Sequence, residues 1–258
     1  MSDFVMFALV GFFAQLIDGA LGMGYGVISS VVLLASGVPP AHTSASVHAA
    51  KLFTTAASGT SHILHGNVDR RLMILLSAAG VVGGVAGALV LVNLSGGKIR
   101  PYVFAYLMIM GIVIMWRGLQ LEQNRALKKN LVVPLGTAGG FLDAIGGGGW
   151  GPVVTSSLIG AGAHPRFVVG TVNAAEFVVT CAIVSAFAAT LIFGTWQDAN
   201  GIWDHARAVA GLVAGGIPAA LIAGWLLKKA PRKPLMLGVG GLVVLLSAYE
   251  LFKMAGWL

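Results

Sequence analysis

Two ionisable residues lie well inside apolar stretches of this sequence. Lys51 and Glu176 each stand about nine residues into a predicted helix, which is roughly 14 Å from its start. An ionised side chain at such a depth in a membrane costs several kcal/mol unless it faces water, a ligand or a partner. A lysine could bind an anion there, and a glutamate could carry a proton or act as a gate. The alternative is a structural Lys51–Glu176 ion pair that locks the two helices together.

Lys51 belongs to a polar stripe on the helix predicted over residues 42–65. The stripe residues recur at spacings of three and four, so they share one helix face. They are Ser44, His48, Lys51, Thr55, Ser58 and His62. The corresponding stretch in the second half of the chain carries Asn173, Glu176 and Thr180.

Two glycine-rich breaks precede these helices. DGALGMGYGV begins at Asp18, and DAIGGGGWGP begins 125 residues later at Asp143. The same register aligns Pro165 with Pro40 and Glu176 with Lys51 without a gap. The chain is therefore two copies of one unit.

The composition places this unit in a lipid bilayer. Hydrophobic residues make up 57% of the chain and charged residues only 10%, with a mean hydropathy of +0.88. The net charge of +7 falls in short loops between apolar runs, so it indicates topology and excludes nucleic acid as the expected partner. The spacings Gly80–Gly84, Gly83–Gly87 and Gly211–Gly215 predict close helix packing.

The distribution of basic residues predicts how each break lies in the membrane. If each broken segment crossed the bilayer, Lys and Arg would divide almost evenly between the two faces. If each turns back as a re-entrant hairpin, only Lys98, Arg100, Arg207 and Lys253 fall on one face. The second arrangement matches the excess of positive charge expected on a cytoplasmic face. It leaves three spans per repeat, and an odd number inverts the second repeat relative to the first.

We therefore predict an all-α integral membrane protein of two inverted repeats. Each repeat is a Gly-broken re-entrant helical hairpin followed by three membrane-spanning helices. Residues 1–119 form the first repeat, 120–130 a basic cytoplasmic linker, and 131–258 the second repeat. The predicted hairpin helices cover 4–17 and 27–36, then 131–142 and 153–162, and the predicted spans cover 42–65, 72–94, 102–118, 167–193, 206–227 and 235–252. The location is a bacterial inner membrane, with both termini external.

A re-entrant hairpin would bring helix N-termini to the membrane midplane. Free backbone N–H groups and the partial positive charge of a helix N-terminus favour an anion. Glycine permits positive φ and close approach of the backbone, and Pro152 suits a first helical turn. The alternative is that the glycines only make tight turns and close packing.

Other residue types indicate little further chemistry. We expect Asp18 and Asp143 to hydrogen-bond nearby backbone or to pair with a cation. The His62 and His65 spacing would suit a metal ion, but no further ligand completes a site, so we expect a solvated helix end there and no bound metal. No nucleophile, metalloprotease or phosphate-loop motif occurs, so we expect neither an enzyme nor a cofactor.

The repeated motifs resemble the sulfite exporter TauE/SafE family of bacterial membrane permeases. The similarity lies in GGGGWGPVV followed by GTVNAAE, and in GMGYGVISS followed by TSASVHAAK. It implies secondary transport of small sulfur oxyanions or organosulfonates, such as sulfite, thiosulfate or sulfoacetate, across the inner membrane. We predict an exporter with proton coupling. The first half has GMGYGV in place of a glycine run and no Pro at position 27, which leaves open whether both halves contribute equally.

The resemblance and the residue patterns together give a candidate site. The substrate-binding candidates are Gly22, Gly24, Tyr25, Gly26, Ser46, His48, Lys51, Gly148, Gly149, Trp150, Gly151, Thr171, Asn173 and Glu176. The candidates for coupling or gating are Glu176, His48, Asp18 and Asp143. An uncoupled anion channel, a carrier of other carboxylates or sulfonates, and a purely structural membrane protein are the alternatives. The transported anion, the direction, the coupling ion and the oligomeric state, with a homodimer as one option, stay open.

Overall fold

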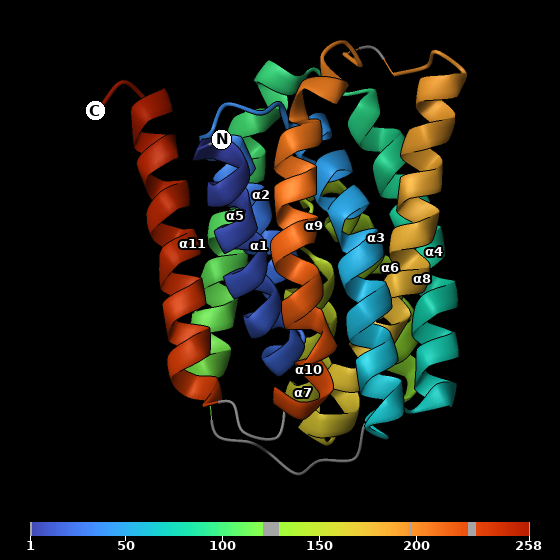
Figure 1. Cartoon of the computed structure of the whole chain (residues 1–258). Helices are drawn as coiled ribbons and strands as arrows, with labels where there is room; N and C mark the ends of the chain where they lie inside the picture. Colours follow the sequence, from blue (N-terminus) through green and yellow to red (C-terminus); the bar gives the residue numbers. More distant parts are fainter. Residues whose placement is uncertain (1, 121–128, 197, 227–230, 258) are drawn as a thin grey trace.

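The chain folds into a bundle of helices (Figure 1). The computed structural model describes residues 2–120, 129–196, 198–226 and 231–257, and this part of the chain contains no β-strand. Five of its helices are long and apolar enough to cross a membrane: Phe4–Leu21, Arg70–Val92, Gly96–Leu119, Pro165–Ile192 and Arg232–Met254. The prediction of an all-α, multi-pass membrane protein is confirmed at this level.

The first half of the chain contains five helices. They are α1 (Ser2–Leu21), α2 (Tyr25–Ala35), α3 (Pro40–Leu64), α4 (Arg70–Val92) and α5 (Gly96–Leu119). The 25 residues of α3 are enough to cross a bilayer, but its polar stripe makes the helix less apolar than the five helices above.

The second half follows the same order of elements. They are the short turn η1 (Lys129–Leu131), α6 (Val132–Gly146), the π-helical turn η2 (Gly151–Thr155), α7 (Ser156–Gly160), α8 (Pro165–Ile192), the turn η3 (Ile202–His205), α9 (Ala206–Leu221), α10 (Ala223–Leu226) and α11 (Arg232–Met254). Pro152 stands in the first turn of η2, as predicted. Most of the predicted linker 120–130 lies outside the described residues.

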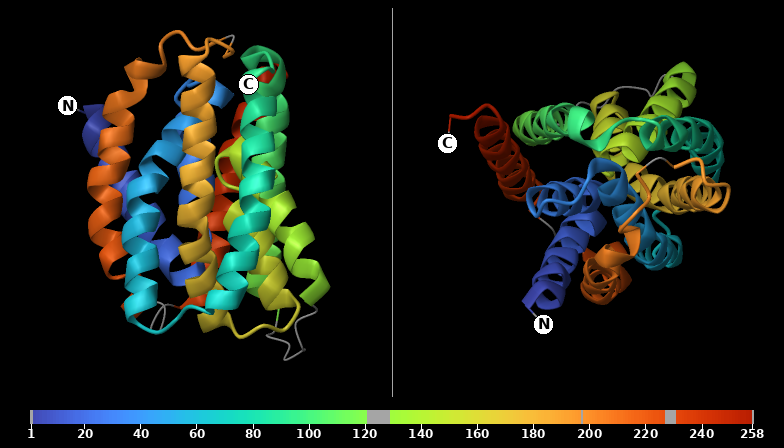
Figure 2. Two further views of the ribbon diagram at one scale, coloured as in Figure 1. Left: turned by 90° about the vertical axis from the view of Figure 1, so that its right-hand side faces the viewer. Right: turned by 90° about the horizontal axis from the view of Figure 1, so that it is seen from above.

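The path of the chain is clear in Figure 1. Both marked termini lie at the upper end of the bundle; α1 descends from there and α2 returns towards it. The second half begins at the lower end, where α6 rises and α7 returns downwards. Figure 2 shows the same courses from the side and from above.

The breaks are shorter than the sequence predicted, and this corrects the helix boundaries. Only residues 22–24 separate α1 from α2, because the helix continues through Gly19 until Gly22 adopts a φ of 69°. Gly24, with a φ of 139°, completes that turn. In the second half, α6 continues to Gly146 and Gly147 ends it with a φ of 71°. The expected first helix 4–17 is thus too short, since α1 has 20 residues and is long enough to span.

The two halves interlock through glycine seams. A side chain added to Gly215 of α9 would collide with the carbonyl group of Ala8 in α1. A side chain added to Gly83 of α4 would collide with the carbonyl group of Thr137 in α6. The first helix of each half therefore packs against a helix of the other half. The predicted close packing at these glycine spacings is confirmed.

Candidate functional site

The two glycine-rich breaks meet in the interior of the bundle. A Cβ on Gly26 would collide with Gly147, and a Cβ on Gly148 would collide with the backbone of Val27. Thr155 Oγ1 also donates a hydrogen bond of 2.8 Å to the carbonyl oxygen of Gly22. Only glycine at these positions lets the two backbones come so close.

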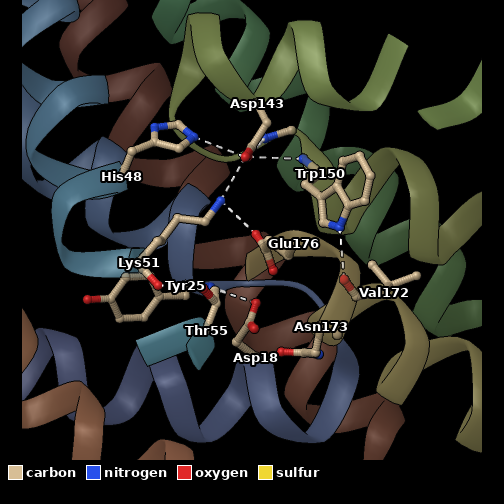
Figure 3. Close-up of polar contacts among 12 residues, drawn as sticks. Asp18, Tyr25, His48, Lys51, Thr55, Asp143, Trp150, Val172, Asn173 and Glu176 are labelled. Carbon is tan, nitrogen blue, oxygen red and sulfur yellow. Dashed lines mark hydrogen bonds and ion pairs between the residues drawn. The ribbon is translucent and has the colours of Figure 1, made fainter. Parts of the chain in front are cut away.

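Lys51 of α3 lies beside this contact and is held by two carboxylates from the other half (Figure 3). Its Nζ is 2.8 Å from Asp143 Oδ2 and 2.6 Å from Glu176 Oε1. All three side chains are buried, with 1% of Lys51 and 5% of Glu176 exposed. Asp143 stands near the end of α6 and Glu176 stands in α8, so three helices position this cluster. The ion pair that the sequence offered as a structural alternative is present.

His48 extends the cluster by one helical turn. Its Nε2 is 3.1 Å from Asp143 Oδ2, and its Nδ1 is 2.8 Å from the carbonyl oxygen of Ser44. Both contacts are hydrogen bonds at once when the ring carries a proton on each nitrogen, or when the carboxyl group supplies one of the two protons. Asp143 Oδ2 therefore contacts both His48 and Lys51.

Asp143 also caps the helix that follows the second break. Its Oδ1 accepts hydrogen bonds from the backbone N–H groups of Gly149, at 2.9 Å, and Trp150, at 3.1 Å. In the first break, Asp18 Oδ1 accepts a hydrogen bond of 3.2 Å from the N–H of Tyr25. The backbone contacts expected for both aspartates are present. These amides face carboxylates of the protein itself, so an incoming anion would have to replace an aspartate there.

Tyr25 and Trp150 stand at matching places and have matching surroundings. The Tyr25 ring packs against Gly216, and its hydroxyl group donates to the carbonyl oxygen of Leu212 at 3.3 Å. The Trp150 ring packs against Gly80, and its Nε1 donates to the carbonyl oxygen of Val172 at 3.1 Å. Both rings are fully buried in the interior of the bundle.

The structure separates the remaining candidates. Asn173 accepts a hydrogen bond of 2.9 Å from Ser58 Oγ, which links the two polar stripes. Thr171 Oγ1 instead accepts a hydrogen bond of 2.8 Å from the backbone N–H of Asp69. Asp69 lies at the start of α4, so this contact is not part of the Lys51 cluster. Ser46 is buried on another side of α3 from Lys51.

Gly22 and Gly151 belong to the contact between the breaks, whereas Gly24 packs against its own half. A Cβ on Gly151 would collide with Gly22 and Met23, and a Cβ on Gly24 would meet the side chain of Ile17. These glycines therefore shape the backbone around the cluster. A role for them in binding substrate stays a prediction.

The expectation for His62 is wrong. Its side chain is completely buried, because α3 continues past it and the residues after Leu64 fold back over the helix end. Asn67 Nδ2 lies 3.3 Å from His62 Nδ1. Among the described residues, no group of three His, Cys, Asp or Glu side chains is arranged to hold a metal ion.

Two polar residues near the breaks were missed, a half-buried tyrosine with a buried hydroxyl group and a buried glutamine. Tyr106 of α5 places its ring against Gly146 and its hydroxyl group against Gly149. Gln15 of α1 is completely buried, and neither of its amide atoms has a hydrogen-bond partner within the described part of the chain. A polar residue one helical turn before Asp18 was a usable signal for Gln15, whereas nothing in the sequence around Tyr106 distinguishes it from a packing residue.

Comparison with known proteins assigns the family. The model of the sulfite exporter TauE/SafE family matches residues 7–251. The chain belongs to this family. TauE/SafE proteins are membrane transporters, so the chain is a transporter and not an enzyme.

Two curated TauE/SafE relatives illustrate the range of similarity. The chain is 44% identical over 261 residues to the probable membrane transporter protein YtnM of Bacillus subtilis, covering 98% of this chain and 84% of that protein. It is 37% identical over 62 residues to sulfite exporter TauE/SafE family protein 6 of Arabidopsis thaliana, covering 24% of this chain and 14% of that protein. No solved structure matches the chain.

Proposed function

We propose that the chain is a secondary transporter that exports small sulfur-containing anions, such as sulfite, thiosulfate or organosulfonates, across a bacterial inner membrane. The family name and the name of the Arabidopsis relative support the substrate class. The name of the Bacillus relative supports transport in general.

The observation that carries the proposal is the buried Lys51 beside the contact between the two breaks. A lysine in a dry interior attracts an anion strongly, because the low dielectric constant screens the charge poorly. His48 lies beside the same carboxylate. The backbone amides of Gly149 and Trp150, which donate to Asp143, supply further donors to an anion that replaces this carboxylate. Several converging donors are what a divalent anion needs when it leaves water.

The charges of the cluster give a reason for proton coupling. With both carboxylates ionised, Lys51, Asp143 and Glu176 together carry one net negative charge, which opposes a second anion. Protonation of Glu176 makes the group neutral and frees one side of the Lys51 ammonium group. The anion and one proton therefore bind together, and Glu176 competes with the substrate for Lys51.

The direction follows from the same charges. A divalent anion that moves with one proton carries one net negative charge. A membrane potential that is negative inside drives this charge outwards by about 2.3 kcal/mol per 100 mV. The potential therefore favours export.

We further propose that the helices form two inverted repeats with re-entrant hairpins. The support is that α1 and α2 start and finish at the same end of the bundle, as do α6 and α7 at the other end (Figure 1). The basic residues at the upper ends of the described helices are Lys98, Arg100, Arg207 and Lys253, and those at the lower ends are Arg70, Arg71, Arg117, Arg166, Arg232 and Lys233. This excess supports a cytoplasmic lower end and external termini. Transport is then a rocking of one half against the other about the Lys51 cluster. A homodimer stays a prediction.

Flux into proteoliposomes tests the proposal. The purified protein is reconstituted, and uptake of sulfite, thiosulfate and sulfoacetate is measured with acetate as a comparison, with and without an imposed pH gradient. We expect saturable uptake of a sulfur anion that the proton gradient drives above equilibrium. Uptake that neither saturates nor accumulates would instead identify an uncoupled channel.

Variants connect this flux to the cluster. Lys51→Met alone leaves two buried carboxylates without a cation, so the charge-balanced double variant Lys51→Met with Glu176→Gln guards against simple misfolding. We expect the folded double variant to lose flux and Glu176→Gln to lose the response to the pH gradient. Glu250→Gln is the matched control, because Glu250 is also buried in a membrane helix but pairs with Arg100 at 3.6 Å. Equal loss in the control would contradict the assignment.

A further inference from the structure

A basic cavity opens at the lower end of the bundle, between the ends of α1, α5, α7 and α11. Its volume is about 360 Å³, roughly ten times the share of one water molecule in the liquid. Arg117, Arg232 and Lys233 line it, and among the residues that the structure describes none of those lining it is an aspartate or a glutamate. The cavity is therefore large enough for a hydrated anion and positive in charge.

Arg117 gives this cavity an organised cation. Its guanidinium group lies 4.8 Å from the centre of the Trp116 ring and against Gly160, where a side chain would collide with it. Its NH1 donates to Gln120 Oε1 at 3.1 Å, which is a neutral partner. Its Nε is buried and has no hydrogen-bond partner within the described ranges. No described carboxylate pairs with Arg117, whereas Lys51 has two such partners.

The inner wall of the cavity belongs to the two breaks. Met23 and Ser156 both line it, and Ser156 Oγ contacts Met23 Sδ at 3.8 Å. Their neighbours Gly22 and Thr155 form the hydrogen bond that joins the breaks. The cavity therefore ends at the contact beyond which the Lys51 cluster lies.

We propose that Arg117, with Arg232 and Lys233, forms a second anion-binding site, which receives the oxyanion before it passes the Met23–Ser156 contact to Lys51. The assignment of the ligand as the transported anion rests on the proposed function. The binding itself does not, because it depends only on the cavity and its cations. Because no described carboxylate pairs with Arg117, its guanidinium group binds an oxyanion through charge-assisted hydrogen bonds without the loss of an ion pair seen in the structure.

Trp116 supplies a direct readout. The purified protein in nanodiscs of phosphatidylcholine is titrated with sulfate while tryptophan fluorescence is recorded, and the response of Trp116→Phe is subtracted to isolate this ring. We expect a saturable change. It should weaken about tenfold in Arg117→Gln and recover in part in Arg117→Lys, which keeps the charge.

Two controls separate this site from other sources of signal. Arg71→Gln removes a charge at the same end of the bundle but outside the cavity, so it should titrate like the parent protein. Lys51→Met with Glu176→Gln should also keep the response, which distinguishes this site from the central one. A parent-like titration of Arg117→Gln, or a response that never saturates, would overturn the proposal.

Anionic lipid is the other source of the same chemistry. The titration is therefore repeated in discs that contain phosphatidylglycerol. Sulfate binding that persists there supports a site for the free oxyanion. If the lipid itself produces the Trp116 change and sulfate no longer adds to it, the cavity holds a lipid headgroup and the proposed route to Lys51 falls.

Flux tests the route. In proteoliposomes, Arg117→Gln should raise KM for the anion and leave the maximal rate close to that of the parent, because the central cluster is intact. An unchanged KM with normal flux would overturn the role of Arg117 in transport. A protein without any flux would instead contradict the proposed function, while the fluorescence titration would still decide on the cavity.

Discussion

The two glycine-rich breaks are alike in packing and unlike in charge. Tyr25 and Trp150 each pack on a glycine of a neighbouring helix, and the two breaks bury each other's backbones. The aspartates differ. The Asp143 carboxylate accepts hydrogen bonds from two backbone N–H groups and also contacts His48 and Lys51. The Asp18 carboxylate accepts one hydrogen bond within the described residues, from the backbone N–H of Tyr25.

This difference shows how a duplicated scaffold can carry an asymmetric site. Lys51 and Glu176 stand at equivalent positions of the two halves, yet one is a cation and the other an anion, and they pair across the centre at 2.6 Å. The glycine packing that both halves share holds the helices in place. The opposite charges of Lys51 and Glu176 then form a single site between the two copies. Each half alone would leave its charge buried and unpaired.

We expect the largest difference in the free energy of unfolding between the variants Asp143→Asn and Asp18→Asn. In Asp143→Asn the Lys51 ammonium group keeps Glu176, but the bonds that Asp143 accepts from Lys51, His48 and two backbone N–H groups weaken or break, so we expect a loss of about 3–5 kcal/mol. In Asp18→Asn one hydrogen bond to a charged acceptor weakens, which should cost about 1–2 kcal/mol. Reversible unfolding of the purified protein in mixed micelles measures both. Equal losses would show that the two aspartates are equivalent after all.

Alanine at the contact between the breaks should have the next largest effect, and the same effect in both halves. Gly26→Ala and Gly148→Ala each place a methyl group against backbone of the opposite break, so we expect each to cost about 1–3 kcal/mol. Gly238→Ala is the matched control, because nothing lies within 4 Å of its added Cβ. The melting temperatures of the three variants measure these losses. An unchanged melting temperature in Gly26→Ala together with a large fall in Gly148→Ala would show that the two breaks are not packed alike.

The aromatic residues of the breaks should show a smaller contrast. Tyr25→Phe removes one hydrogen bond, to Leu212, and should cost about 1 kcal/mol. Trp150→Phe removes the bond to Val172 and also leaves space beside Gly80, so it should cost more, about 2–4 kcal/mol. Thermal unfolding in the same detergent compares the two. A larger loss in Tyr25→Phe than in Trp150→Phe would mean that the phenol has a role beyond packing.

The smallest expected effect is at the outer contacts between the halves. At the upper end, His205 Nε2 lies 3.3 Å from His42 Nδ1, and burial followed by the charge of His42 lowers the pKa of His205, although Asp204 opposes this. At the lower end, Arg166 Nε donates to Asn67 Oδ1 at 2.7 Å, and this contact contains no histidine.

The sign of the pH effect follows from that lowered pKa. The unfolded chain takes up the His205 proton more readily than the folded chain, so the stability is full above the ordinary pKa of about 6.5 and falls as the pH drops below it. Melting temperatures between about pH 5 and 8 should show less of this fall in His205→Gln, and Arg166→Gln should leave the slope unchanged. An unaltered slope in His205→Gln would assign the effect to another group.

The sequence predicted the scaffold better than the site. Hydrophobic runs and the repeated breaks identified the helices and the membrane, because length and composition decide whether a helix can span a bilayer. The ends of α1 and α6 were misplaced, since a helix tolerates glycine until one residue adopts a positive φ, and composition does not tell which glycine that is.

The site depended on contacts between distant residues. The stripe on α3 predicted which face of the helix is polar, and both Lys51 and Glu176 were identified. That Asp143, and not Asp18, joins Lys51 follows only from how α3 packs against α6, over a separation of 92 residues. Arg117 and Tyr106 were missed for the same reason, because the second break and the helix after it pack against them from far along the chain.

Thermal stabilisation by anions tests the central claim most directly. Arg117→Gln is first introduced into both the parent protein and the double variant Lys51→Met with Glu176→Gln, so that the second proposed site contributes to neither. Both proteins are melted in the presence of sulfite, thiosulfate, sulfoacetate and acetate, because a ligand of the folded state raises the melting temperature once its concentration exceeds Kd. We predict that at least one sulfur anion stabilises the parent and that this shift is absent, or far smaller, in the folded double variant. Equal stabilisation of both proteins by the same anion, or stabilisation of neither by any of them, would contradict an anion site at Lys51.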